Sequence, residues 1–422
     1  MSIFVYNKLM KNNEKIFRRE KYLAKIRPFY DAFDIIKVIT GVRRCGKSTI
    51  MKMIMDELIE SGVENEAVKY INLDSLDYRN IKTSNNLEQL IAKIISTDKN
   101  YYLLIDEIQN VQDFESVINA FREMGNVSIF VTGSNSYLLS GELITKLTGR
   151  YLEFEIYTLT FDEYLEMKKQ MNLATDSDIH KELISYLTQG GFPRAVFFND
   201  NEAARTYVEG IVSEIFEKDI AQRVRVNNKK TFQIVQNFII NNYASPMSIR
   251  SIHEALLKAG NNISRSTIAR YIEILENAKI IYECDRFDMK SKKSLSGEKK
   301  FYLADLAFYY ARNADTRPNI GPSLENLVYI FLKSKNYSVS VGRIGRCECD
   351  FIVRTPKSNY AYIQVCYMLA DDAIVEREFR PLQRIQDNYG KYVISCDSYN
   401  FSQQGIRHIN FNDLFCGKID LE

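Results

Sequence analysis

A glycine-rich segment near residue 40 contains the side chains whose types and spacing are best suited to chemistry. Its sequence is Gly41-Val42-Arg43-Arg44-Cys45-Gly46-Lys47-Ser48-Thr49. It fills every fixed position of the phosphate-loop pattern G-x-x-x-x-G-K-[ST]. The β-branched run 35–39 before it predicts a strand, and the apolar spacing of 49–55 after it predicts a helix. Because glycines let backbone N–H groups turn toward phosphate oxygens, we expect residues 41–49 to contact a bound nucleotide.

The chemistry of a bound ATP assigns roles to particular side chains. Lys47 can reach the β- and γ-phosphates, and the Ser48 hydroxyl can ligate Mg²⁺. A second apolar run, 101–105, predicts a buried strand that ends in Asp106 and Glu107. Asp106 is expected to hold the Mg²⁺ shell, and Glu107 to polarise the attacking water as general base. The alternative is an ordinary glycine turn and a solvated acidic turn, which leaves the joint presence of both motifs unexplained.

Composition limits the class of protein. A chain of 422 residues is too long for one typical core, so two or three domains are expected. Hydrophobic residues at 45% and charged residues at 26% are typical of a soluble globular protein. A net charge of +2 means that any polyanion-binding surface must be local. Seven scattered cysteines and the lack of a signal-peptide pattern predict a cytoplasmic protein, and no apolar run is long enough for a membrane span.

Apolar runs alternate with helical segments in the first third of the chain. They cover 35–39, 67–73, 101–105 and 127–135. This alternation predicts a parallel α/β sheet, in which ligands bind at the carboxyl ends of the strands. The phosphate loop, the acidic pair and the small polar residues Ser134 and Asn135 are therefore expected at one edge of the sheet.

Three motifs together resemble those of AAA-type ATPases. They are Gly41–Thr49, Leu103–Glu107 and Val131–Asn135. The resemblance implies ATP binding and hydrolysis, with Ser134 or Asn135 sensing the γ-phosphate. Over roughly residues 15–400 the chain more closely resembles the bacterial and archaeal group of such ATPases that carry an uncharacterised C-terminal domain, the domain of unknown function 4143.

The same resemblance assigns roles to two arginines. Arg150 lies where relatives carry an arginine finger, which acts on a neighbouring subunit and therefore implies a homo-oligomer; a plain salt bridge is the alternative. Arg194 ends the segment 190–194, which resembles the small helical lid of the superfamily. It would contact the nucleotide as a sensor, and a structural role is the alternative.

The middle of the chain has the pattern of a winged helix-turn-helix. Helices are predicted at 247–257, with Ser248 as a cap candidate, and at 263–276, capped by Ser264, before a strand at 280–284. The predicted wing contains Lys290, Lys292, Lys293, Lys299 and Lys300. The second helix begins with Ser264, Arg265, Ser266 and Thr267, types that contact phosphates and bases in duplex DNA. The alternatives are a packing or dimerisation module and a solvated lysine-rich hairpin.

The C-terminal third contains a weaker constellation. Glu325 on a predicted helix, Asp350 on a strand and Gln364 on the next strand resemble the layout of metal-dependent restriction-like nucleases. Cys366 stands where that layout has a lysine, so the usual source of transition-state charge stabilisation is missing. Arg343, Arg346 or another basic residue could replace it. We expect a nuclease-like fold without nuclease chemistry; an ordinary α/β domain is the alternative.

Together these observations predict an α/β protein: a P-loop NTPase parallel sheet with a helical lid, then a winged helix and a small restriction-nuclease-like domain. The expected boundaries are 1–160 for the ATPase core, 161–200 for the lid, 201–310 for the winged-helix region and 311–422 for the degenerate nuclease-like domain. The predicted function is Mg²⁺-dependent ATP hydrolysis coupled to movement of the C-terminal domains on DNA. The alternatives are a nucleotide-gated switch whose C-terminal half binds protein, and an ATP-regulated metal-dependent nuclease.

Overall fold

The computed structural model describes most of the chain. The residues described are 16–133, 149–198, 200–221, 228–288, 293–313, 319–344, 347–356, 358–417 and 421. The chain divides into two compact units, Met1–Ile156 with Gln170–Asn172, and Tyr157–Lys169 with Leu173–Glu422. It therefore passes between the units at three places, after Ile156, Lys169 and Asn172.

The first unit is built on a parallel sheet of five strands. Its strands in spatial order are β2 (Val68–Asn72), β3 (Tyr101–Asp106), β4 (Val127–Thr132), β1 (Ile36–Thr40) and β5 (Tyr151–Glu155). Every residue of β1, β3 and β4 is buried, which explains why these strands are nearly continuous apolar runs. The four predicted strands are present, and β5, which the apolar pattern did not indicate, adds an edge beside β1.

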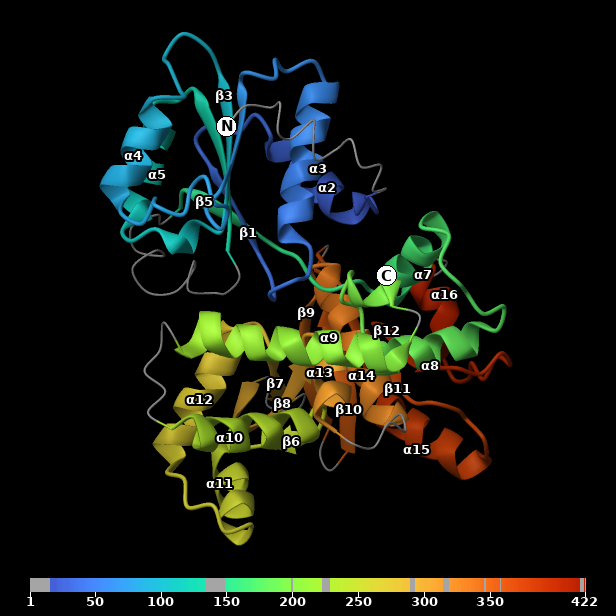
Figure 1. Ribbon diagram of the computed structural model, residues 1–422. Coiled ribbons are helices and arrows are strands. Elements are labelled where there is room, and N and C mark those ends of the chain that lie inside the picture. Colours follow the sequence, from blue (N-terminus) through green and yellow to red (C-terminus); the bar gives the residue numbers. More distant parts are fainter. Residues whose placement is uncertain are drawn as a thin grey trace. The chain divides into compact units, whose positions relative to one another are not determined.

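Helices cover both faces of this sheet (Figure 1). On one face lie α2 (Glu20–Ile26), η1 (Arg27–Phe29) and α3 (Lys47–Glu60). On the other lie α4 (Ser84–Ala92) and α5 (Phe114–Glu123), with η2 (Ile108–Asn110) after β3. Leu87, Val117 and Phe121 of α4 and α5 pack with strand residues such as Leu103 into one apolar core. This packing holds the strands in the register that aligns their carboxyl ends.

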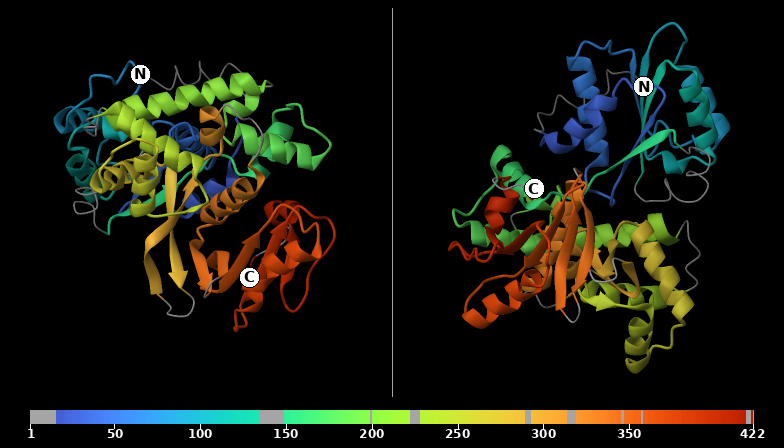
Figure 2. Two further views of the ribbon diagram at one scale, coloured as in Figure 1. Left: turned by 90° about the horizontal axis from the view of Figure 1, so that it is seen from below. Right: turned by 180° about the vertical axis from the view of Figure 1, so that it is seen from behind.

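The second unit contains a mixed sheet of eight strands (Figure 2). In spatial order they are β13 (Arg407–Asn410), β12 (Gly390–Ser395), β11 (Tyr360–Val365), β10 (Cys347–Arg354), β9 (Ser338–Ile344), β7 (Ile281–Asp288), β8 (Lys293–Leu303) and β6 (Pro246–Met247). The order α14–β9–β10–β11–α15–β12, with β11 and β12 parallel, follows the helix-and-strand layout expected for the C-terminal third. The whole protein is therefore of the mixed α/β class.

The helices of the second unit precede, separate and follow the strands of this sheet in sequence. They are α7 (Phe161–Gln170), α8 (Ile179–Gln189), η4 (Ala195–Phe197), α9 (Asn201–Glu214), η5 (Ile215–Ala221), α10 (Lys229–Asn241), α11 (Ile249–Lys258), α12 (Arg265–Asn277), α13 (Ala307–Arg312), α14 (Ile320–Ser334), α15 (Asp372–Gln383) and α16 (Phe411–Phe415). The N–H of Gly191 donates to Asp305 Oδ2 at 2.8 Å. This bond connects the segment after α8 to the segment after β8. Gly191, which belongs to the predicted lid, is thus packed within this unit.

Helices α11 and α12 occupy the two places predicted for a helix-turn-helix. Ser248 and Ser251 form a capping box at the start of α11, and the Ser264 hydroxyl accepts from the N–H of Thr267 at 3.2 Å at the start of α12. The hairpin β7–β8 follows α12, and β6 pairs with β8 on its other side. The capping serines explain why these boundaries are readable from sequence.

The hairpin does not end a separate domain, because β7 also pairs in parallel with β9. Arg286 of β7 is in register with Val341 of β9, so hydrogen bonding continues across the predicted boundary at 310/311. The strands of the hairpin and of the C-terminal segment therefore form one sheet.

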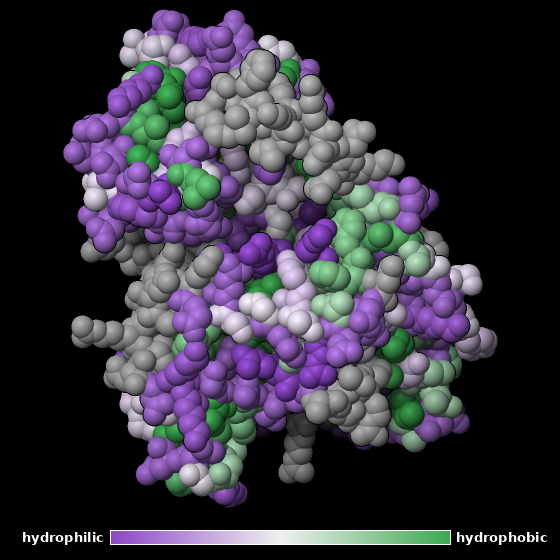
Figure 3. All heavy atoms as spheres, viewed as in Figure 1, coloured by the Kyte–Doolittle hydropathy of each residue, from purple (hydrophilic) through white to green (hydrophobic). Residues whose placement is uncertain are grey.

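The surface is mostly hydrophilic on the face shown in Figure 3, where apolar residues lie in separate patches. Leu76 and Tyr399 are among the exposed large apolar residues. Among the described helices, none is both long enough and apolar enough to span a lipid bilayer.

Candidate functional site

The predicted phosphate loop connects the carboxyl end of β1 to the first turn of α3. Gly41 has φ 142° and Gly46 has φ 108°, both in the region that favours glycine. At Gly41 a side chain is also sterically excluded, because a Cβ there would overlap the carbonyl oxygen of Ile156. Gly46 is the N-cap of α3, and a Cβ there would meet nothing within 4 Å. Space therefore remains beside the backbone where the helix begins.

Lys47 is the first residue of α3, and its buried side chain bends back over the loop. Its Nζ donates to the carbonyl oxygens of Gly41 at 2.9 Å and Val42 at 3.2 Å. Arg19, directly before α2, donates from Nη1 to the carbonyl oxygen of Cys45 at 3.2 Å. Two cationic groups and the N-terminus of a long helix thus meet at one loop, an arrangement that favours phosphate.

Asp106 is the last residue of β3, and neighbouring strands fix its carboxylate. Its Oδ1 accepts a hydrogen bond from the Thr132 hydroxyl at the end of β4. Its Oδ2 accepts from the Tyr70 hydroxyl of β2 at 2.9 Å. Asp106 is buried, so these two donors stabilise an otherwise costly carboxylate and hold it in one orientation.

Glu107 follows Asp106 and turns the chain with φ 59°, an uncommon value for a residue other than glycine. Its N–H donates to Thr132 Oγ1 at 3.0 Å, and its side chain accepts from the Gln109 amide. Burial raises the pKa of Glu107, while the positive charges of Lys47 and Arg43 oppose that shift. A buried carboxylate with a raised pKa is a better proton acceptor than an exposed one, as a general base requires.

The remaining predicted loop residues lie between the end of β1 and the first turn of α3. Ser48 and Thr49 are half-buried in the first turn of α3. Arg43 is buried, whereas Arg44 is exposed with φ 68°. Ser134 and Asn135 lie outside the described residues, so γ-phosphate sensing by either side chain stays a prediction.

Arg150 lies directly before β5, and its carbonyl oxygen accepts from the N–H of Ile36 at the start of β1. The phosphate loop follows the other end of β1, roughly 16 Å away along a five-residue strand. The half-exposed side chain pairs with Glu123 at 3.4 Å and donates to Asn119 at 3.3 Å. Arg150 thus lies at the opposite end of the strands from the phosphate loop of the same chain. A role as arginine finger would require the phosphate loop of another copy.

Arg194 belongs to the second unit and precedes η4. Its exposed guanidinium lies over the ring of Phe197, 5.5 Å from the centroid. A sensor role for Arg194 stays a prediction.

The structure adds three polar residues to the site to which the sequence analysis assigned no role. They are Tyr70, Gln109 and Thr132. The sequence signal for Tyr70 and Thr132 is a hydroxyl group within, or at the end of, a predicted strand. That signal has no fixed spacing from Asp106, because the strands meet only in the folded sheet.

The nuclease-like constellation lies on the expected elements, Glu325 on α14, Asp350 on β10 and Gln364 on β11. Gln364 accepts from the N–H of Asp350 at 3.3 Å and donates to Glu378 Oε2 at 2.9 Å. Burial raises the pKa of the Cys366 thiol well above its usual range, so this side chain is neutral. In the described part of the chain, no group of three or more His, Cys, Asp or Glu side chains is arranged to hold a metal ion.

The prediction of a lysine-rich wing needs a correction. Lys299 pairs with Glu283 and lies 3.5 Å from Asp285, so its charge is largely neutralised. Lys300 is buried, and its ammonium faces Glu325 and Glu348 instead of solvent, because alternate residues of β8 point to opposite sides. Lys290 and Lys292 lie outside the described residues, as does the side chain of Lys293.

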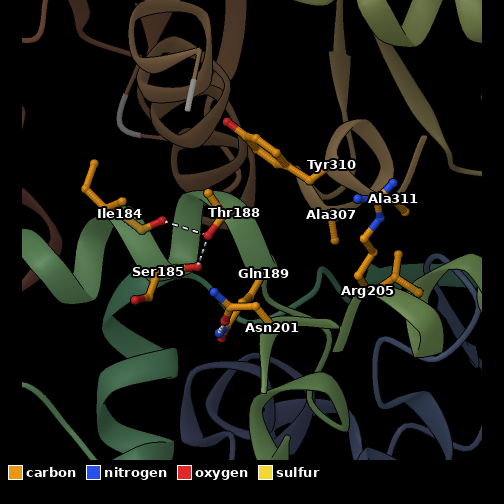
Figure 4. A pocket seen from close by; sticks show the side chains of 10 residues that line it. Ile184, Ser185, Thr188, Gln189, Asn201, Arg205, Ala307, Tyr310 and Ala311 are labelled. Carbon is orange, nitrogen blue, oxygen red and sulfur yellow. Dashed lines mark hydrogen bonds between the residues drawn. The ribbon is translucent and has the colours of Figure 1, made fainter. Parts of the chain in front are cut away.

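A cavity of about 280 Å³ in the second unit lies among α8, α9 and α13 (Figure 4). The Thr188 hydroxyl there donates to the carbonyl oxygens of Ile184 and Ser185, and Gln189 donates to Asn201. The lining contains no carboxylate or histidine. Arg205 pairs with Glu209 and the Tyr310 hydroxyl accepts from the N–H of Asn319, so neither lining side chain is free. The cavity therefore lacks the carboxylates found beside the phosphate loop.

Comparison with known proteins places this geometry in a family. Residues 34–165 match the AAA domain family, and residues 180–317 match Domain of unknown function (DUF8612). An uncharacterised protein of Haemophilus influenzae is 35% identical over 389 residues, which cover 92% of this chain and 95% of that protein. Uncharacterized protein MJ1544 of Methanocaldococcus jannaschii is 30% identical over 392 residues, covering 90% and 85%. Among solved structures, the Walker-type ATPase paby2304 of Pyrococcus abyssi has a TM-score of 0.50 at 15% identity, covering 71% of this chain and 96% of that chain.

The fold and the loop define an AAA-type P-loop domain, as the sequence predicted. The chain belongs to the family of these uncharacterised bacterial and archaeal proteins. The expected domain of unknown function 4143 is not confirmed, since the match in the middle of the chain is to DUF8612.

Thr132→Val keeps the size of the side chain and removes the hydroxyl that orients Asp106 and Glu107. Loss of a hydrogen bond to a charged group costs about 1.5–3 kcal/mol, so we expect the rate of ATP hydrolysis to fall roughly tenfold or more. Thr132→Ser keeps the hydroxyl and should stay near the parent rate. Steady-state ATPase assays on both variants test this, and equal rates for the two would contradict the role of the hydroxyl.

Proposed function

We propose that the AAA unit binds ATP with Mg²⁺ at the phosphate loop and hydrolyses the bond between its β- and γ-phosphates. One observation carries the proposal: Lys47, Asp106 and Glu107 lie at the carboxyl edge of one parallel sheet, with the Lys47 ammonium inside the loop. Ligands bind at this edge in open α/β sheets. The AAA-domain match over 34–165 supports the same conclusion.

The donor set fits a triphosphate and a hard divalent cation. Gly46 leaves open space at the N-terminus of α3, and the ammonium of Lys47 lies within the loop. Ser48 and Asp106 supply the hydroxyl and carboxylate oxygens that Mg²⁺ prefers. Bound there, Mg²⁺ would neutralise charge that develops on the phosphate oxygens. Lys47 would orient the β- and γ-phosphates, and its present carbonyl partners would be exchanged for phosphate oxygens.

Glu107 would accept the proton of the attacking water. Gln109 is placed to help, because its Nε2 donates to Glu107 while its buried Oε1 has no hydrogen-bond partner among the described residues. An unpaired buried amide oxygen can accept a hydrogen bond from a water that also reaches Glu107. The pair therefore supplies both an acceptor for the proton and an acceptor that orients the second O–H.

We also propose that hydrolysis is coupled to movement of the second unit. Gly41 packs against Ile156, and the N–H of Ile156 donates to Thr40 at 2.8 Å. Ile156 is the residue after which the chain enters the second unit. There the N–H of Leu159 donates to Gly191 at 2.8 Å, and Thr158 donates to Ala304 at 3.3 Å. A change in the loop would therefore act directly on the connecting peptide.

Two substitutions separate binding from chemistry. Lys47→Ala should abolish ATP turnover and strongly weaken nucleotide binding, because it removes the cation from the loop. Glu107→Gln should bind ATP at near-parent affinity and fail to turn it over, because only the base is lost. Equilibrium binding of a fluorescent ATP analogue and single-turnover hydrolysis measure both, with Lys52→Ala on the same helix as control. Parent-rate turnover by Glu107→Gln would show that another group is the base.

Arg150 provides a test of assembly. If it acts on the loop of a neighbouring copy, specific activity should rise with protein concentration, and Arg150→Ala should reduce the rate by roughly 10³-fold with little change in ATP affinity. Arg79→Ala, an exposed arginine of the same unit, is the control. Specific activity that is independent of concentration, with a mild Arg150→Ala effect, would assign Arg150 to its surface pair with Glu123 alone.

Duplex DNA is a second candidate partner, through a winged helix formed by α11, α12 and the β7–β8 hairpin. The observation that favours it is the first turn of α12, where Arg265 and Ser266 are exposed at a helix N-terminus. The neutralised Lys299 and the buried Lys300 reduce the charge that the hairpin can contribute. A nucleotide-gated protein-binding switch is therefore the direct competitor.

Charge reversal at α12 distinguishes the two partners. Arg265→Glu should weaken binding of unrelated duplexes to a similar extent and reduce the slope of log K against log salt by about one unit for each DNA phosphate that the protein no longer neutralises. Arg205→Glu on α9 is the matched control. Fluorescence anisotropy at several salt concentrations measures both variants. Absence of duplex binding by the parent protein at low salt would favour the protein-binding switch.

A further inference from the structure

A buried lysine lies at the meeting point of three carboxylates in the second unit. Lys300 of β8 is only 3% exposed. Its Nζ lies 2.8 Å from Glu325 Oε1, 2.8 Å from Glu348 Oε1 and 4.0 Å from Asp350 Oδ1. The acids come from α14 and from β10, while the lysine comes from β8, on the far side of β7 and β9 in the sheet (Figure 1).

Other donors hold these carboxylates in place around the ammonium. The Tyr302 hydroxyl donates to Glu325 Oε1 at 2.6 Å. Arg286 donates from Nη2 to Glu348 Oε2 at 2.8 Å, which leaves Oε1 for Lys300. The N–H of Val365 donates to Asp350 Oδ2 at 2.8 Å, which leaves Oδ1 facing Lys300. For Glu348 and Asp350, one oxygen is therefore held by the fold and the other is directed at the cation.

We propose that the Lys300 ammonium takes the place of a divalent metal ion in this cluster, so that the native chain excludes the metal and a latent site appears when the lysine is removed. Glu325 and Asp350 are the two acids that the nuclease-like layout would use to bind a metal, and both face Lys300. Carboxylate oxygens converging from separate elements suit a hard cation, and an ammonium has three donors to satisfy them.

The geometry is that of an ammonium and not of a metal ion. The two short N–O distances are 2.8 Å, whereas Mg²⁺ binds oxygens at about 2.0–2.1 Å and Ca²⁺ at about 2.3–2.6 Å. Glu348 retains partial exposure at 29% of its side chain, which gives a small ion a path to the cluster.

Charge balance explains why the lysine excludes a metal. The Lys300 ammonium lies 2.8 Å from both Glu325 Oε1 and Glu348 Oε1, and its charge offsets theirs. A divalent ion would therefore have to enter beside a positive charge that the fold already holds in place.

The decisive comparison is Mn²⁺ binding to nucleotide-free protein, measured by electron paramagnetic resonance. Lys300→Ala should bind about one more Mn²⁺ per chain than the parent, and Lys300→Ala/Asp350→Asn should return to the parent level. Lys299→Ala removes the neighbouring lysine, which pairs with Glu283, and should resemble the parent. Because no nucleotide is present, the result does not depend on the ATPase assignment.

Stability gives a second readout. Lys300→Ala leaves the carboxylates uncompensated, so its melting temperature should fall in metal-free buffer and recover as Mn²⁺ is added, whereas the parent should not respond. A variant that folds only with Mn²⁺ would support the proposal equally. A Lys300→Ala protein that binds no additional Mn²⁺, or that stays unfolded in its presence, would overturn it. So would parent protein that binds Mn²⁺ in a manner abolished by Asp350→Asn.

Discussion

The close approach of Gly41 to Ile156 is the constraint on which the first unit depends. No side chain fits at Gly41, and the same contact places β5 beside the loop strand β1. The residues that follow Ile156 are fixed within the second unit by bonds to Gly191 and Ala304. The lack of a side chain at Gly41 therefore lets the phosphate loop pack against Ile156. Ile156 follows the edge strand β5 and directly precedes the second unit.

Each unit also stabilises buried carboxylates, but with different partners. Around Asp106 the donors are neutral hydroxyls of Thr132 and Tyr70, which leaves the negative charge available to a cation. Around Glu325 the partners are the ammonium of Lys300 and the hydroxyl of Tyr302, which leave little charge uncompensated. The first arrangement suits the proposed binding and release of Mg²⁺ together with a nucleotide. The second suits a site that is already occupied by the protein itself.

The sequence predicts features that depend on local order along the chain. The phosphate loop, the strand before Asp106 and the capped starts of α11 and α12 each lie within a few consecutive residues, and all are present. The roles of Thr132 and Lys300 are not predictable in this way, because Thr132 lies 26 residues after Asp106 and Lys300 lies 25 residues before Glu325. The sequence pattern even assigns Lys300 to a solvent-facing wing, since composition does not reveal which side of β8 faces the cluster. The pairing of strands in the sheet, which local patterns do not encode, determines the roles of both Thr132 and Lys300.

The pairing of β7 with β9 has a practical consequence for cutting the chain. A fragment that begins at 311 would retain β9 to β13 but lose β6, β7 and β8. The edge of β9 would then present unpaired N–H and C=O groups, including those of the buried Val341, and such edges recruit strands from other molecules. The same cut would remove Lys300 and Arg286 from Glu325 and Glu348. A cut that leaves this sheet intact must therefore lie before β6, not at the start of the nuclease-like segment.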